Sequence, residues 1–439
     1  MTNKEKILSQ VCDFFITSND FNGIPITTLA KNTEIEYSET IDILKELTKE
    51  GLVSNQKTIN PHIIALGHFE EDYQLSVLED AKNNKTEKIQ SFGTINITFD
   101  SHLICVYPSE KHLKKTRDTS SFSQKPYSKR LALGEPQLKA AFFEIEVLDN
   151  YFKDPRYSFE FEDYSGQICC DYDENQQPLL PKEEDQIFLK TFGLGVNEKK
   201  ERVAVVYLTY LSSLTSEHQL YWKSKEVDNG CRMLKEYYAN TIEGNWTFSY
   251  SIFSAFIEEH RLINEISNTF STESLFNKTF ENEKRPKEFT FFFMPTLENY
   301  HNFISLLDKM LSDNINRNFF NDKIELYELE ELPSGQVERK NKGTLRLLEE
   351  WIRLKYKHPE NQLFIDIFKP IKKVRKERQS PAHKISDNHY DKKLNKKQIE
   401  LLTEVYKSLK LLRMIFEQHP KSSKIEIPEW IVKGNIKIF

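Results

Sequence analysis

Glycine and cysteine are both scarce in this sequence, and each shortage excludes a class of site. Only 13 of the 439 residues are glycine, which argues against a fold built around glycine-rich phosphate loops. The stretch Phe192-Gly193-Leu194-Gly195 has no third glycine and no following Lys-Ser or Lys-Thr pair, so it is not such a loop. The five cysteines fit no zinc or redox spacing. We expect them to be reduced, structural residues: Cys12, Cys105, Cys169, Cys170 and Cys231.

Long apolar runs are also missing. No stretch of about 18 apolar residues is present, so no transmembrane helix is predicted. The first residues, MTNKEKILSQ, lack the apolar core and the cleavage site of a signal peptide, so we expect a cytoplasmic protein without a membrane partner. Potential metal ligands are not grouped either, because Asp171-Tyr172-Asp173-Glu174 lacks the glycine and the spacing of a calcium loop. We therefore predict neither a metal nor a cofactor.

Charge is unevenly distributed along the chain. The net charge is −6, yet residues 369–397 contain eleven Lys or Arg and three acids, which makes this segment +8 and the remainder −14. A basic patch on an acidic protein indicates an anionic partner, although a solvated helix face gives the same pattern. The basic residues are Lys369, Lys372, Lys373, Arg375, Lys376, Arg378, Lys384, Lys392, Lys393, Lys396 and Lys397.

Residues 1–60 are predicted to form a small helical unit. Three apolar-periodic segments are followed by a strand, and the pattern IPITTLAKNTEIEYSETIDILKELTKEGLVS resembles a winged helix-turn-helix. Its recognition helix, expected at 38–50, contains Lys45 and Lys49 but four acids. A helix that reads DNA needs basic side chains to offset the phosphate charge. The net acidic helix favours a protein contact or dimerisation role.

Residues 61–295 are predicted to form a mixed α+β domain of unknown role. Alternating apolar and polar residues predict strands at 92–99, 103–107, 157–161, 203–208 and 289–293. Apolar periodicity predicts helices at 216–240 and 250–270. The stretch 108–137, rich in Lys, Ser and Pro, is predicted to be a long loop without regular structure.

Residues 296–439 are predicted to be a helical bundle. Apolar stripes predict four helices, at 300–310, 345–352, 363–371 and 399–416. A hairpin or loop is expected at 320–342, and a tail at 425–439 that returns to the bundle. The chain is therefore predicted to be a multidomain α+β protein with a winged-helix-like unit, a mixed middle domain and a helical bundle.

A short motif follows the third predicted helix of the bundle. Arg378-Gln379-Ser380-Pro381-Ala382-His383 has the form R-x4-H, with a polar residue directly after the arginine. With the surrounding residues 297–420, this motif resembles the HEPN domain, a helical bundle found in ribonucleases of toxin and antiviral systems. The resemblance implies a homodimer in which two motifs face one cleft. It also implies a role in phage defence by abortive infection, in which a regulatory protein or a phage trigger controls the activity.

The residues of the motif suit metal-independent RNA cleavage on chemical grounds. A histidine with a pKa of about 6.5 can take the proton of the 2′-hydroxyl or protonate the leaving 5′-oxygen, so His383 is the predicted acid–base residue. Arg378 would stabilise the charge of the phosphorane, and Gln379 would bind a phosphate oxygen or orient His383. The RNA backbone is expected to contact Lys372, Lys373, Arg375, Lys376 and Lys384.

Two other interpretations stay open beside the leading prediction of an endoribonuclease. The N-terminal unit can make the chain a DNA-binding regulator. Alternatively, the bundle can be a catalytically silent scaffold that binds nucleic acid through its basic patch. The motif residues can also be purely structural, with Arg378 paired to Glu377 or Asp387 and His383 capping a helix.

Overall fold

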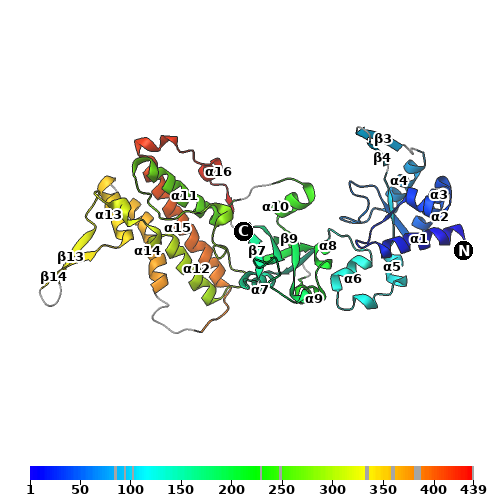
Figure 1. Cartoon of the computed structure of the whole chain (residues 1–439), viewed down its shortest axis with the longest axis horizontal. Coiled ribbons are helices and arrows are strands. Elements are labelled where there is room, and N and C mark those ends of the chain that lie inside the picture. Colours follow the sequence, from blue (N-terminus) through cyan, green and yellow to red (C-terminus); the bar gives the residue numbers. More distant parts are fainter. Residues whose placement is uncertain are drawn as a thin grey trace. The chain divides into compact units, whose positions relative to one another are not determined.

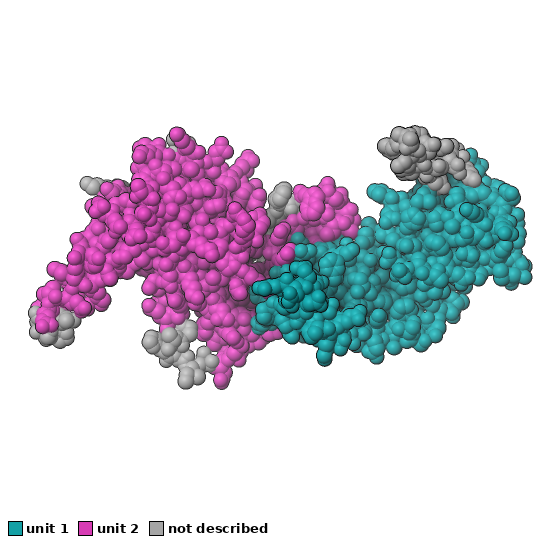
Figure 2. All heavy atoms as spheres, viewed as in Figure 1, with its two compact units in different colours: residues 1–159, 165–234 teal, residues 160–164, 235–439 magenta. Residues whose placement is uncertain are grey.

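The computed structural model of this chain divides into two compact units (Figures 1 and 2). Unit 1 comprises residues 1–159 and 165–234, and unit 2 comprises residues 160–164 and 235–439. The prediction of a multidomain α+β protein is confirmed, but the units differ from the three domains predicted from the sequence. The structure describes residues 1–83, 87–92, 95–100, 103–227, 230–246, 250–331, 336–356, 361–379 and 387–437.

Unit 1 begins with three helices and a three-stranded antiparallel sheet. The helices are α1 (Asn3–Thr17), α2 (Ile26–Thr33) and α3 (Tyr37–Lys49). The strands β1 (Ile24–Pro25), β2 (Val53–Gln56) and β5 (Cys105–Pro108) pair in the order β1-β5-β2. Apolar residues of α1, α2 and α3 share one buried core with Val77, Leu78 and Val106. Residues beyond 60 therefore belong to this first subdomain.

One further helix covers part of α3. This helix, α4 (Glu71–Asn83), contacts α3 through two ion pairs, one between Lys45 and Glu79 and the other between Lys82 and Asp42, at 2.5 Å. It is followed by the hairpin of β3 (Glu87–Phe92) and β4 (Ile95–Asp100), where the sequence predicted one strand at 92–99.

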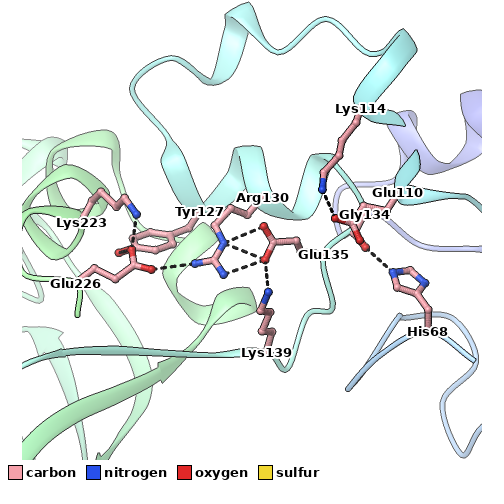
Figure 3. Close-up of polar contacts among 10 residues, drawn as sticks. All are labelled: His68, Glu110, Lys114, Tyr127, Arg130, Gly134, Glu135, Lys139, Lys223 and Glu226. Atoms are coloured by element: carbon pink, nitrogen blue, oxygen red, sulfur yellow. Dashed lines mark hydrogen bonds and ion pairs between the residues drawn. The ribbon is translucent and has the colours of Figure 1, made fainter. Parts of the chain in front are cut away.

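The prediction of an irregular loop at 108–137 was wrong. The segment forms α5 (Glu110–Thr116), capped by the Ser109 hydroxyl, and α6 (Pro126–Ala132), which has its proline in the first turn. Figure 3 shows the contacts that hold α6 in place. Arg130 donates hydrogen bonds to Glu135 and also to Glu226, the latter at 3.1 Å. Buried Tyr127 donates to the same Glu226 at 3.0 Å. These long-range contacts order a stretch whose composition is typical of loops.

The remainder of unit 1 is built on a second antiparallel sheet of order β6-β10-β9-β8-β7, with β11 paired to β9. Its strands are β6 (Ala140–Glu144), β7 (Tyr157–Phe161), β8 (Ser165–Cys170), β9 (Phe188–Val196), β10 (Arg202–Tyr207) and β11 (Arg232–Met233). Three helices accompany it: α7 (Asp149–Lys153), α8 (Leu208–Ser212) and α9 (Ser216–Ser224). The strands predicted at 103–107, 157–161 and 203–208 are confirmed by β5, β7 and β10.

The prediction of one helix at 216–240 was wrong for the second half of this range. The structure has α9, then β11, and then the short α10 (Lys235–Tyr238), which opens unit 2. Gly230 adopts a positive φ of 65°, and Arg232 and Met233 pair with β9. A left-handed residue followed by a paired strand cannot continue an α-helix.

Unit 2 is a helical bundle in which α11, α12, α14 and α15 lie side by side (Figure 1). Their bounds are α11 (Ile252–Phe270), α12 (Leu297–Met310), α14 (Gln362–Gln379) and α15 (Lys393–Glu417). A shorter helix, α13 (Thr344–Lys355), packs through Trp351 on Phe319 and Phe416. All the predicted helices of the C-terminal part are present. The bundle also includes α11, so it begins before residue 296.

The strand predicted at 289–293 was wrong. Phe289, Phe291, Phe292 and Phe293 are all buried, but none lies in a strand. Phe289 packs against rings of α11 and α12, and the backbone carbonyl of Thr290 accepts a hydrogen bond from the Gln398 side chain of α15, at 2.9 Å. The helices of the bundle, rather than a neighbouring strand, therefore cover this segment.

The predictions of a hairpin or loop at 320–342 and of a returning tail at 425–439 are confirmed. A hairpin of β13 (Tyr327–Glu331) and β14 (Val337–Asn341) occupies the predicted 320–342 segment. The tail returns to the bundle through α16 (Glu429–Lys433) and β15 (Ile436–Lys437), which pairs in parallel with β12 (Tyr250–Ser251). Trp430 stacks on Tyr250 with a centroid separation of 3.9 Å. All five cysteines are free thiols, as predicted.

Candidate functional site at the end of α14

Arg378 lies in the last turn of α14, inside the bundle of unit 2. Its helix forms because Phe364, Ile367, Phe368, Ile371 and Val374 make one buried stripe, which leaves the basic residues on the remaining faces. The segment that follows α14 leads into α15, the longest helix of the described residues. The sequence predicted this helix at 363–371 with the motif after it and a long helix next. In the structure α14 continues to Gln379, so Arg378 lies within the helix rather than after it.

Two aspartates hold the Arg378 guanidinium. Its Nη1 donates to Oδ2 of Asp308 at 2.7 Å and to Oδ2 of Asp313 at 2.5 Å. Asp308 is 1% exposed, whereas the Asp313 side chain is 40% exposed. These hydrogen bonds, first the one to Asp308 and then the one to Asp313, raise the pKa of Arg378. The partners are not Glu377 or Asp387, the two acids expected if the motif were purely structural.

Part of the guanidinium makes no hydrogen bond with the described residues. Both aspartates use Nη1, and Nε and Nη2 of Arg378 donate to no described residue. The side chain is 35% exposed. An arginine has five N–H donors in a fixed fork, so a phosphate can bind the free edge while the aspartates fix the orientation of the group.

Acids from other elements neutralise much of the predicted basic patch. For the residues predicted to contact RNA, the pairs are Lys372–Glu349 at 2.6 Å, Lys373–Glu404 at 2.9 Å and Arg375–Asp313 at 3.6 Å. Lys376 is exposed and makes no ion pair with a described residue. The local charge is therefore lower than the +8 of the linear segment, although exposed ion pairs of this kind are worth only about 0–1 kcal/mol and a polyanion can displace them.

The other predicted site residues are distributed as follows. Gln379, the last residue of α14, is exposed and donates no hydrogen bond to the described residues. His383 and Lys384 lie outside the described residues. The structure thus brings Arg378, Gln379 and the basic side chains of α14 onto one helix.

Sequence reasoning missed a second group beside the site. The Tyr300 hydroxyl of α12 donates to Glu377 at 2.6 Å, and Lys397 of α15 contacts the same carboxylate at 3.1 Å. Burial, and next the hydrogen bond to Glu377, raise the pKa of Tyr300 well above its usual value. The neighbouring His301 has a lowered pKa, because of burial and then the charge of Lys397. A histidine near Glu377 is a second acid–base candidate.

Asp308 was also missed, although the sequence contained a signal. It lies four residues after Ile304, on the apolar face of α12, where a charged residue needs a buried partner. Among the described residues, no group of three or more His, Cys, Asp or Glu side chains is placed to hold a metal ion. None of the described helices combines the length and the apolar character required to cross a bilayer.

Comparisons with protein families, curated proteins and solved structures found no match to this chain.

Proposed function

We propose that this chain is a metal-independent endoribonuclease of the HEPN type, which cuts RNA through attack of the 2′-hydroxyl. The observation that supports the proposal most strongly is Arg378, which lies in the last turn of a bundle helix. Two aspartates orient its guanidinium, and its Nε and Nη2 donate to no described residue. The motif residue His383 follows five positions later in the sequence.

The reaction assigns a role to each residue. A base removes the 2′-hydroxyl proton, the 2′-oxygen bonds to phosphorus, and the bond from phosphorus to the 5′-oxygen breaks as an acid protonates the leaving oxygen. The products are a 2′,3′-cyclic phosphate and a 5′-hydroxyl. His383 provides the acid–base group, and Arg378 neutralises the charge that develops on the phosphoryl oxygens. Gln379 hydrogen-bonds a phosphate oxygen or orients His383.

The likeness to HEPN domains extends the proposal to assembly and biology. Two copies of the motif, one from each chain of a homodimer, would form one composite site. The protein would act as a cytoplasmic toxin or antiviral effector, and residues before the bundle would respond to a regulatory protein or a phage trigger. Exposed Lys376, with Lys372, Lys373, Arg375 and Lys384, would hold the RNA backbone by charge.

For the N-terminal unit we propose a winged-helix fold that contacts protein rather than DNA. The order of α1, β1, α2, α3 and β2, with β5 completing the sheet, supports the fold. Two features of α3 support the contact role. Its exposed side chains include Glu39, Asp42 and Glu46, with exposed Glu50 at its C-terminal cap, and Lys45 forms an ion pair with Glu79. A gel shift that shows tight, salt-sensitive binding of duplex DNA, lost when Lys45 and Lys49 are changed, would instead support the DNA-binding regulator.

The test of the ribonuclease is cleavage of labelled single-stranded RNA by the purified full-length chain in the presence of a chelator. Arg378→Ala and His383→Ala should each slow cleavage by about 100-fold or more, because each removes a transition-state interaction. His389→Ala is the matched control, because this histidine is exposed and lies after the motif, and it should cut like the parent. His301→Ala tests the second histidine.

Three outcomes separate the alternatives. If Arg378→Ala and His383→Ala both cut as well as the parent, the assignment fails. Loss of cleavage in His301→Ala, with His383→Ala unaffected, would move the acid–base role to α12. A parent protein that binds RNA with its basic patch but never cuts it would be the silent scaffold.

A further inference from the structure

A cavity of about 580 Å³ lies on unit 2 beside α13 and α14, next to the arginine-bearing end of α14. This volume falls within the range of about 300–1,000 Å³ that is usual for small-ligand sites. Among the described residues, no aromatic side chain lines it, and the large apolar residue in this part of the lining is Leu345. A ligand bound here would therefore be recognised by charge and hydrogen bonding rather than by ring stacking.

Basic residues outnumber acids among the described residues of the lining. Four cations line the cavity, Arg346 and Arg353 from α13 with Lys372 and Arg375 from α14, together with the acids Glu349 and Glu350. Burial raises the pKa of Glu349, but hydrogen bonds from Lys372 and Arg353 outweigh burial and the net shift is downward. The pKa of Glu350 shifts downward in the same way, through hydrogen bonds from Lys342 and Arg346. These downward shifts favour the charged carboxylates, and among the described lining residues the cations still outnumber them.

Several donors in the lining are unused. Arg375 makes no hydrogen bond with a described residue, and its nearest acid, Asp313, is 3.6 Å away. Arg346 uses Nε for Glu350 and Nη1 for Glu328, so its Nη2 donates to no described residue. The lining also includes the N-terminal end of α13, where the capping residue Gly343 has no side chain that could accept hydrogen bonds from the first backbone N–H groups of the helix. Guanidinium N–H groups without a partner are suited to phosphate oxygens.

We propose that this cavity is a binding site for a chain of phosphate groups, with Arg375 as its principal anchor and Arg346, Arg353 and Lys372 as supporting cations. The phosphates belong to a nucleoside polyphosphate or to an RNA backbone, since both present the same chemistry to the arginines. This site deepens the proposed function, which already assigns Lys372 and Arg375 to the RNA backbone, and its RNA ligand rests on that proposal. Binding at Arg375 requires neither His383 nor cleavage, so it can be tested separately from the reaction.

The test measures binding to the full-length chain carrying His383→Ala, so that RNA is not consumed. Tripolyphosphate and ATP are titrated by calorimetry, and a short single-stranded RNA by fluorescence anisotropy. Arg375→Gln should weaken binding by about tenfold or more, the usual effect of losing one charge-assisted hydrogen bond. Lys369→Gln is the matched control, since Lys369 is an exposed cation of α14 outside the cavity lining, and it should bind like the parent. Arg375→Gln removes no hydrogen bond between described residues, so we expect it to fold normally.

The probes also distinguish the two sources of phosphate. Arg375-dependent binding of tripolyphosphate and ATP, without displacement by RNA, supports the site with a free polyphosphate as its ligand. Arg375-dependent binding of RNA alone supports it with the RNA backbone as its ligand. The proposal is overturned if no probe binds, or if Arg375→Gln binds all three as tightly as Lys369→Gln does.

Discussion

Replacing Arg378 should destabilise unit 2 as well as stop cleavage. Arg378→Ala leaves Asp308, which is 1% exposed, without its cationic partner, and the Asp308 Oδ1 has no hydrogen-bond partner among the described residues either. Removing one partner of a fully buried ion pair costs about 3–5 kcal/mol. The Arg378 side chain is 35% exposed, so water screens the pair and the expected loss is reduced to about 2 kcal/mol. Asp313 adds little, because it is 40% exposed.

The assay is thermal unfolding followed by circular dichroism at pH 7. A loss of about 2 kcal/mol should lower the unfolding midpoint by about 6 °C in a domain of this size. Combining Asp308→Asn with Arg378→Ala should recover most of that loss, because no buried charge then remains unpaired. Arg375→Ala, from the same helix, should change the midpoint by less than about 2 °C. An Arg378→Ala midpoint equal to that of the parent would refute the reasoning, and RNA cleavage by this variant should be compared well below its own midpoint.

Three further expectations concern the rest of the fold. Arg413→Met should cost about 3–5 kcal/mol, since Glu259 is fully buried against Arg413 Nε at 2.5 Å, and a double variant that also carries Glu259→Met should recover stability in the same thermal assay. Burial lowers the pKa of His260 to about 4, and the hydrogen bond to the Met310 carbonyl only partly opposes this shift. In the unfolded chain His260 therefore binds a proton below pH 6.5, whereas in the folded chain it does so only at about pH 4. The free energy of unfolding should fall by up to about 3 kcal/mol between pH 6.5 and pH 4, and His260→Gln should reduce this dependence on pH. Gly23→Ala should cost about 1–3 kcal/mol, because a Cβ would lie 2.5 Å from the buried ring of Tyr107.

The helices of unit 2 could be predicted because their apolar residues repeat at helical spacing. The stripes of α12, α14 and α15 bury one face each, and this local pattern does not depend on what the helices pack against. The same reasoning failed for α5 and α6, where lysines and serines concealed two short helices. Those helices depend on the Ser109 cap and on the contact of Arg130 with Glu226, which lies 96 residues away in the sequence.

The electrostatics of the candidate site could be predicted only in part. The basic run is visible in the sequence, and so is the arginine at a helix end. The acids that neutralise the run come from elsewhere, among them Glu349 of α13 and Glu404 of α15. Which acid meets which cation depends on how the helices pack, and this information is absent from residue spacing. Two exceptions carried a signal: Asp308 and Arg413 each interrupt the apolar face of a helix, which indicates a buried ion pair.

The most direct test of the central claim is the chemistry of the RNA ends that the protein produces. RNA incubated with the full-length chain and a chelator is sequenced at both ends of each cut. The account predicts a 2′,3′-cyclic phosphate on one side and a 5′-hydroxyl on the other, with both absent when His383→Ala replaces the parent. Cuts that carry a 5′-phosphate and a 3′-hydroxyl, or cuts that vanish with the chelator, would contradict it.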